Sequence, residues 1–265
     1  MSRTIITLTA DWGVRDFFAG MVKGRLYSSL PDVQVVDLAL GLEPYNIIPA
    51  IYVVRHACQG FPEGTIHIVD VNSVETIDQS FVVVKSHGQY LIGTDNGLPN
   101  AVFGDDFDEA VQINTYQDGD YYTFAAYNLF CKVAIMLAQG TPLSDIGDPM
   151  PTLNRRQLPS FFEEGGHLKV YVTYTDNYGN AYLALTIKEF EAIRRGRRFR
   201  LMVREYMVNE VSHGYDPGRP TARNSARLLL TVSATGHLEI ALKEASAAKL
   251  LGLRTGEAVL IYFDE

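Results

Sequence analysis

The sequence predicts two domains: an α/β N-terminal domain with a Rossmann-like, mostly parallel sheet and flanking helices, followed by a smaller, mostly β C-terminal domain. Val- and Ile-rich runs alternate with helical patterns at first, and strand patterns dominate later. At 265 residues, the chain is also long for one compact core. We expect the N-terminal domain at 1–150, a linker at 151–167 and the C-terminal domain at 168–265.

The N-terminal elements follow from short apolar runs separated by amphipathic stretches. Strand, helix, strand, helix, strand in this order implies parallel pairing through crossover helices. Strands are expected at 5–10, 33–38, 65–71, 81–86 and 89–93, and helices at 16–29, 47–59 and 128–139. Prolines and glycines then interrupt every periodicity over 142–166, which predicts a segment without regular structure.

The C-terminal pattern changes to alternating strands. They are expected at 169–174, 182–186, 199–206, 227–232, 238–242 and 258–263. Thr186 and Glu189 have the spacing of a capping box, which predicts a helix start there. A second helix is expected at 246–251, closed by Gly252.

Composition limits the classes of function. The net charge of −8 argues against a nucleic-acid surface, although the basic run 194–200 leaves RNA binding open beside a solvated edge. No apolar run approaches the roughly 20 residues of a membrane span, and the chain opens on a strand, so a cytoplasmic protein is expected. Cys58 and Cys131 lie in apolar segments and are predicted to be buried free thiols. No metal-ligand spacing is present.

Two fragments place polar side chains at strand ends. The strand at 5–10 ends on Asp11, with Asp16 close behind, where ligands with ribose hydroxyls often bind in α/β domains. The segment 173–180 leaves a strand and offers Asp176 and Asn180 around Gly179. This second fragment is equally typical of a plain hairpin turn.

The motifs, in their order along the chain, resemble the S-adenosyl-L-methionine (SAM) hydroxide adenosyltransferase family, the adenosine-forming SAM hydrolases related to the SAM-dependent fluorinase and chlorinase. Asp11 and Asp16 match a strand ending in Thr-Asp-Phe-Gly with a second Asp five residues after the first. The remaining matches are Phe61-Pro62-Glu63-Gly64-Thr65-Ile66-His67, Asp95-Asn96-Gly97-Leu98, Thr123-Phe124, 137–147 and Gly236-His237-Leu238-Glu239-Ile240-Ala241. The resemblance covers most of the chain.

The resemblance implies roles for individual residues. Asp11 would accept hydrogen bonds from the ribose hydroxyls, with Asp16 nearby. Asp176 would pair with the methionine ammonium and Asn180 would read the adenine edge. The aromatic positions are Tyr45 and Tyr182, which could equally be core rings. The family also implies a homotrimer that binds SAM between subunits without a further cofactor.

The family's water-activating Asp, Arg and His are the main departure. An ungapped alignment puts Asn72, Gln79 and Ala125 in their places. A two-residue gap would give Asp70 the Asp place but would move the Arg place to Ile77. Without a base or a cation, water is a poor nucleophile, and losing general-base assistance costs on the order of 10²–10⁴ in rate.

Three functions therefore remain open from the sequence. The first is a SAM hydrolase that turns over slowly, and the second is a non-catalytic protein that binds SAM or an adenosine-like molecule. The third is a structural homologue without a ligand. Retained binding residues favour the first two, and the substituted triad separates them.

Overall fold

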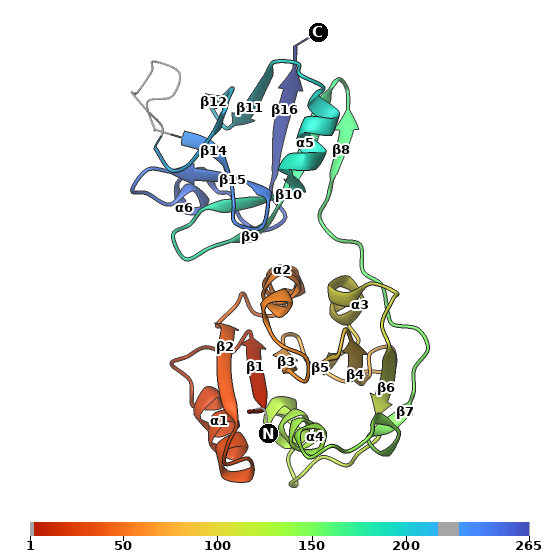
Figure 1. Cartoon of the computed structure of the whole chain (residues 1–265). Coiled ribbons are helices and arrows are strands. Elements are labelled where there is room, and N and C mark those ends of the chain that lie inside the picture. The colour runs from red at the N-terminus through yellow and green to blue at the C-terminus, as the bar shows by residue number, and fades with distance from the viewer. Residues whose placement is uncertain (1–2, 217–227, 265) are drawn as a thin grey trace. The chain divides into compact units, whose positions relative to one another are not determined.

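The computed structural model describes residues 3–216 and 228–264. It divides into two compact units, Met1–Arg156 and Gln157–Glu265 (Figure 1). The first is an α/β unit and the second is mostly β, in the order that the sequence predicts.

The first unit is built on a seven-stranded sheet with the order β2-β1-β3-β5-β4-β6-β7. Its first four strands are parallel: β2 (Gln34–Leu40), β1 (Ile5–Ala10), β3 (Ile66–Asp70) and β5 (Gln89–Thr94). The other three continue the sheet in antiparallel fashion: β4 (Phe81–Ser86), β6 (Glu109–Ile113) and β7 (Gly147–Pro149). The carboxyl ends of β1 and β3 therefore lie side by side.

Helices lie on both sides of this sheet (Figure 1). One side carries α1 (Phe17–Ser29) and α4 (Cys131–Ala138), and the other carries α2 (Ile47–Ala57) and α3 (Leu98–Phe103). Two 3₁₀ helices, η1 (Cys58–Gly60) and η3 (Leu143–Asp145), and the π-helix η2 (Ala126–Phe130) complete the unit. This arrangement covers the apolar strands that a parallel sheet requires.

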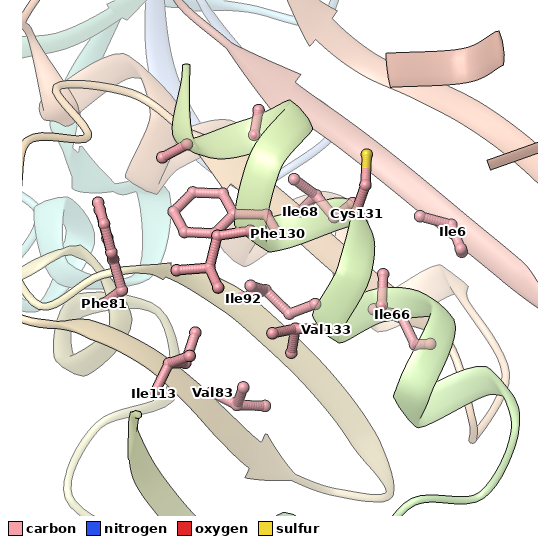
Figure 2. Packing of buried hydrophobic residues seen from close by; sticks show 14 of the residues in the cluster. Ile6, Ile66, Ile68, Phe81, Val83, Ile92, Ile113, Phe130, Cys131 and Val133 are labelled. Carbon is pink, nitrogen blue, oxygen red and sulfur yellow. The ribbon is translucent and has the colours of Figure 1, made fainter. Parts of the chain in front are cut away.

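The core of the first unit forms where η2 and α4 pack on the central strands. Figure 2 shows Phe130 and Val133 in one cluster with Ile68, Ile92 and their neighbours. Phe130 is fully buried and its ring meets Phe81 edge to face at 5.1 Å. This packing fixes η2, whose first residue follows Ala125.

The second unit is a sheet with the order β12-β11-β16-β9-β10-β15-β14-β13, and β8 pairs with β9. The strands are β8 (Phe161–Glu164), β9 (His167–Thr175), β10 (Ala181–Thr186), β11 (Phe199–Val203), β12 (Tyr206–Val208), β13 (Val211–Ser212), β14 (Leu228–Val232), β15 (His237–Leu242) and β16 (Ala258–Phe263). Alternating buried residues on β9 and β10 give this sheet its core face.

Two helices accompany the second sheet within the described part of this unit, 157–216 and 228–264. α5 (Ile187–Arg194) begins with the predicted capping box, in which Thr186 and Glu189 satisfy each other's backbone N–H groups. α6 (Ala247–Leu251) is capped by Ser246 and ends at Gly252, which has φ 67°. Both helix predictions are confirmed.

Some local expectations are wrong because long-range pairing supplies what local sequence does not show. The segment 142–166, expected to lack regular structure, contains η3, β7 and β8, and β8 is ordered by its pairing with β9. The predicted strand 199–206 is two strands, because the chain turns at Arg204, which has φ 54°. α3 and β6 were not predicted at all. Arg227, expected to begin a strand, lies outside the described residues.

The basic run 194–200 is engaged within its own unit. The Arg194 and Arg197 guanidinium groups lie over the rings of Phe199 and Phe263, and Arg200 pairs with Asp264 at 3.2 Å. Arginine that stacks on aromatic rings covers apolar surface as well as carrying charge. The run therefore has a structural use where the end of α5 meets β11 and β16.

Cys58 and Cys131 are free and buried, as predicted. Burial raises the pKa of each thiol to about 12, so both are neutral near pH 7. Among the described residues, no helix has the length and apolar character needed to cross a membrane.

Candidate functional site

Asp11 lies at the carboxyl end of β1 and organises the loops around it. Its Oδ2 accepts the backbone N–H of Tyr45 at 3.0 Å and of Asn72 at 3.1 Å. Its own backbone N–H donates to the carbonyl of Asp70 at 3.3 Å. Within residues 3–216 and 228–264, only Oδ2 of this carboxylate accepts hydrogen bonds, and Oδ1 has no partner.

Both residues that donate to Asp11 have unusual backbone conformations. Tyr45 has φ 64° and Asn72 has φ 50°, in the left-handed region that non-glycine residues seldom adopt. Such strain persists where surrounding contacts hold it, and it gathers at functional sites. The Tyr45 side chain is 78% exposed, so it is not the core ring that the sequence left open.

Asp16 shapes the loop that follows Asp11. Its Oδ2 accepts the backbone N–H of Gly13 at 3.1 Å. Although Asp16 is the N-cap residue of α1, its side chain makes no capping bond to the helix. This hydrogen bond closes the loop that follows Asp11, at the carboxyl end of β1.

Asp70 ends β3 beside Asp11 and is only 7% exposed. Trp12 Nε1 donates to Asp70 Oδ2 at 2.6 Å, and the Trp12 ring meets Phe124 edge to face at 6.0 Å. Burial raises the pKa of Asp70 to about 6, and the hydrogen bond from Trp12 offsets only part of that shift. A carboxyl group with this pKa exchanges a proton near neutral pH.

The three substituted positions differ in their surroundings. Asn72 adjoins Asp11 through its backbone N–H. Gln79 lies on the loop before β4, where its backbone pairs with Thr76. Ala125 is 7% exposed, directly follows Phe124 and packs in the core ahead of the π-helix η2. Among these three, only Asn72 has a hydrogen bond to Asp11.

The second unit brings together the other predicted ligand residues. Asp176 accepts the Asn180 backbone N–H at 2.9 Å on Oδ1, and the Asn180 side-chain amide at 3.1 Å on Oδ2. The Tyr182 hydroxyl donates to Oδ2 at 3.3 Å. This confirms a tight β9–β10 hairpin, and three predicted residues form one cluster within it.

Gly179 allows this hairpin to approach α6. It has φ 83°, and a Cβ there would overlap the Ser246 side chain. Its carbonyl accepts the Ala248 backbone N–H at 2.8 Å. Only glycine combines this conformation with this approach, so the turn and the start of α6 are positioned together.

A cavity of about 780 Å³ lies against the Asp176 cluster. Its lining residues are Asp176, Tyr178, Asn180, Tyr182, Tyr215, Leu229, Leu242, Lys243, Glu244, Ala245 and Ser246. Both polar and aromatic groups face it, and its volume falls within the range of small-molecule sites.

The sequence did not assign roles to Tyr215 and Glu239. Glu239 is fully buried, and the Tyr215 hydroxyl donates to its Oε1 at 2.9 Å. Burial raises the pKa of Glu239, and nearby Asp176 adds to the shift. The only sequence signal was the family-like Gly236–Ala241 fragment, which contains Glu239 but does not reveal its burial.

Within residues 3–216 and 228–264, no group of three or more His, Cys, Asp or Glu side chains is placed to hold a metal ion.

Models of the SAM hydroxide adenosyltransferase N-terminal and C-terminal domains match residues 6–147 and 170–260. The chain belongs to the SAM hydroxide adenosyltransferase family. The resemblance inferred from the motifs and the two-domain α/β and β layout are thereby confirmed.

Related proteins match nearly the whole chain. An (R)-S-adenosyl-L-methionine hydrolase of Salinispora tropica is 27% identical, with 97% of each chain covered. The hydrolase of Thermus thermophilus is 27% identical over 94% of this chain and 96% of its own. A fluorinase of Actinopolyspora mzabensis is 24% identical over 98% and 97%.

A solved structure shares the fold. A crystal structure of an uncharacterized conserved protein from Thermotoga maritima superposes with a TM-score of 0.82 at 23% identity. The match covers 98% of this chain and all of that one. At this level of identity, the match concerns the fold alone.

Proposed function

We propose that this protein binds SAM and cleaves it with water to adenosine and methionine, slowly because the family's triad is incomplete. The observation that carries the proposal is the pair of carboxylates at neighbouring strand ends, Asp11 with a free oxygen and Asp70 with a raised pKa. Family membership across both domains supplies the substrate class.

Binding is assigned to the two clusters. The free Asp11 Oδ1 suits a ribose hydroxyl, and Asp16 and Tyr45 shape the same edge. In the other unit, Asp176 suits the methionine ammonium, with Asn180 and Tyr182 contacting the adenine. SAM is the substrate, and no further cofactor is part of the proposal.

We assign water activation to Asp70 rather than to the position of Asn72. The resemblance implies that the family's water-activating Asp begins the motif Asp-Pro-Gly-Val-Gly-Thr-x-Arg, in which a glycine stands two residues after the Asp. Asn72 stands two residues after Asp70. Asn72 has φ 50°, a conformation that favours Gly and, next, Asn. The backbone thus supports the gapped alignment, in which Asp70 takes the place of the family's Asp.

In the proposed reaction, water attacks the ribose C5′ as the C5′–S bond breaks. The bonding electrons go to sulfur, which becomes the neutral thioether of methionine. The proton from water passes to the Asp70 carboxylate and later to solvent. An ionised Asp70 is the base that this step requires.

The missing partners limit the rate. With Asp70 in the Asp place, the Arg place falls on Ile77, which is fully exposed, and the His place is Ala125. Among the described residues, no cation pairs with Asp70. Water positioning must then rely on neutral groups, which supports turnover well below that of a complete triad.

The same substitutions favour a second candidate, a non-catalytic protein that binds SAM or an adenosine-like molecule. Its specific observation is Ala125, a buried methyl group where a proton-accepting imidazole would stand. Binding through Asp11 and Asp176 would be unaffected.

We further propose a cytoplasmic homotrimer with the SAM site between subunits. Large exposed apolar side chains near the Asp11 edge support an interface: Val14, Phe17 and Tyr45. A nucleic-acid partner is not proposed, because the net charge is −8.

The test is to incubate the purified chain with SAM and to quantify adenosine and methionine by chromatography. Wild type should form both in equal amounts, and Asp70→Asn should reduce the rate at least tenfold while calorimetry still detects SAM binding. Asp78→Asn, an exposed carboxylate on the loop before β4, is the matched control. Binding without product from wild type selects the non-catalytic candidate, and the absence of binding rejects both.

A further inference from the structure

A second cavity lies in the first unit, lined by the ends of α2, α3 and the β4–β5 turn. Its volume is about 480 Å³, and its lining residues are Arg55, Cys58, Gln59, Phe61, His87, Gln89, Val102 and Phe103. His87 and Gly88 form the turn that precedes β5, whereas Asp11 follows the end of β1. Since β1 and β5 run in the same direction, this cavity lies at the opposite end of the parallel strands from Asp11.

Arg55 supplies the charge in this cavity. Its Nε donates to the Ala101 carbonyl at 3.0 Å, and its Nη2 contacts the same oxygen, which leaves Nη1 unused. In the part of the chain that the structure describes, Arg55 has no carboxylate partner. Partial burial disfavours the charged guanidinium and lowers its pKa. An anion bound beside the guanidinium would offset this cost of desolvation.

The cavity floor is rigid and already satisfied. Gln89 donates to the carbonyls of Cys58 and Phe61 at 3.1 and 2.6 Å. Its Oε1 must therefore accept from His67 Nε2, at 3.2 Å, which leaves His67 Nδ1 to accept from Thr7 at 2.7 Å. These groups fix the shape of the pocket and offer no competing donor for a ligand.

His87 adds a second donor at the rim. It occupies the first central position of a two-residue hairpin turn, with φ 50°, followed by Gly88 with φ 72°. Ser86 Oγ lies 2.9 Å from its Nδ1, and Nε2 has no partner among the described residues. Phe61, Val102 and Phe103 supply the apolar lining.

We infer that this cavity is a second ligand site, distinct from the SAM site proposed above, for a small carboxylate with an apolar body. The Arg55 guanidinium and the His87 imidazole hold the carboxylate, and the Phe61 and Phe103 rings cover the apolar part. None of the described residues that line the cavity is Asp or Glu, so the ammonium group of an amino acid would find no partner there. A single arginine also suits a monoanion better than a phosphate dianion.

The test uses phenylacetate as the probe, titrated into the full-length chain by calorimetry at low salt. We expect saturable binding, and we expect Arg55→Gln to weaken it at least about tenfold, since a charge-assisted contact is lost. Arg3→Gln is the matched control, because Arg3 is exposed and also donates to a backbone carbonyl, that of Asp32. It should leave binding unchanged.

Two further measurements keep the outcome clear. Phenylacetamide, which has the same ring without the charge, should not bind. His87→Asn, which keeps a residue tolerant of positive φ, should weaken binding by a smaller factor. Each variant is first shown to unfold with the wild-type thermal midpoint. The inference is overturned if folded wild type does not bind phenylacetate at about 10 mM, or if Arg55→Gln binds it as wild type does. SAM binding is independent of either result.

Discussion

Asn72 donates its backbone N–H to Asp11 Oδ2 at 3.1 Å, and it does so from the left-handed conformation, φ 50°. The hydrogen bond joins the loop after β3 to the residue after β1. It orients the Asp11 carboxylate so that one oxygen is occupied by protein and the other is available. Asp70 ends β3, which pairs with β1, so Asp70 and Asp11 lie at neighbouring strand ends.

Asp11→Asn should keep the fold and lose much of the affinity for SAM. The amide oxygen still accepts the N–H groups of Tyr45 and Asn72, but the charge toward the ribose is gone. Loss of a hydrogen bond to a charged group is worth about 1.5–3 kcal/mol, which is roughly tenfold or more in the dissociation constant. Calorimetry measures it. Asp37→Asn on β2 is the control, and equal affinity of the two variants would remove Asp11 from the site.

Asp70→Asn should change how stability depends on pH. The folded pKa of about 6 lies above the ordinary 3.8, so the folded state holds the proton more tightly than the unfolded state. Wild type therefore loses stability relative to the variant as pH rises from 3.8 through 6, by up to about 3 kcal/mol. Urea unfolding at pH 4 and pH 7 measures this. A difference that does not depend on pH would mean that Asp70 has an ordinary pKa.

Turnover, where present, should follow the ionisation of Asp70. As general base it must be deprotonated, so the rate should fall below about pH 6. The measurement is the initial rate of adenosine formation from pH 5 to pH 8, at saturating SAM. A flat profile over this range would exclude Asp70 as the base while leaving SAM binding intact.

His67 should contribute with the opposite sign. Burial lowers its pKa from 6.5 to about 4, so the unfolded state takes up the proton first as pH falls. The contribution of His67 to the free energy of unfolding of wild type should therefore fall by about 3 kcal/mol between pH 6.5 and pH 4. His67→Gln lacks this titration, so the stability gap between wild type and variant should narrow toward pH 4. A gap that widened would refute the buried neutral imidazole.

Gly179→Ala should destabilise the second unit and weaken ligand binding at the Asp176 cavity. Alanine would be strained at φ 83°, and its Cβ would clash with Ser246. We expect a loss of about 3 kcal/mol in unfolding free energy. Gly166→Ala is the matched control, because Gly166 has φ 81° and open space around its Cβ position. Gly166→Ala should lower the unfolding free energy only by the backbone strain, about 1–2 kcal/mol. Equal losses in the two variants would mean that the approach to Ser246 is unimportant.

Much of the fold was predictable because its elements carry strong local signals. The apolar runs of β1 and β3, the capping box at Thr186 and Glu189, and Gly252 after α6 all specify structure within a few residues. β8 and β7 were missed because their order comes from pairing with distant strands. The break between β11 and β12 was missed because Arg204 adopts a conformation that its residue type does not favour.

The candidate site divides in the same way. Asp11, Asp176 and Asn180 could be chosen as candidates from the sequence because they follow strands at characteristic spacings. The burial of Asp70 and Glu239, and the approach of Gly179 to Ser246, were not visible in the sequence. Burial and its effect on a pKa depend on residues that come together only in the folded chain.

By itself, the sequence determined the family, the two-domain order and the polar residues that end β1 and β9, because these depend on local patterns and on motif order. Only the tertiary structure decided which carboxylate is desolvated beside Asp11, and that Arg55 lines a cavity with no acidic partner among the described residues. Those properties come from the register of parallel strands and the packing of helices on them, which bring together groups far apart in the chain.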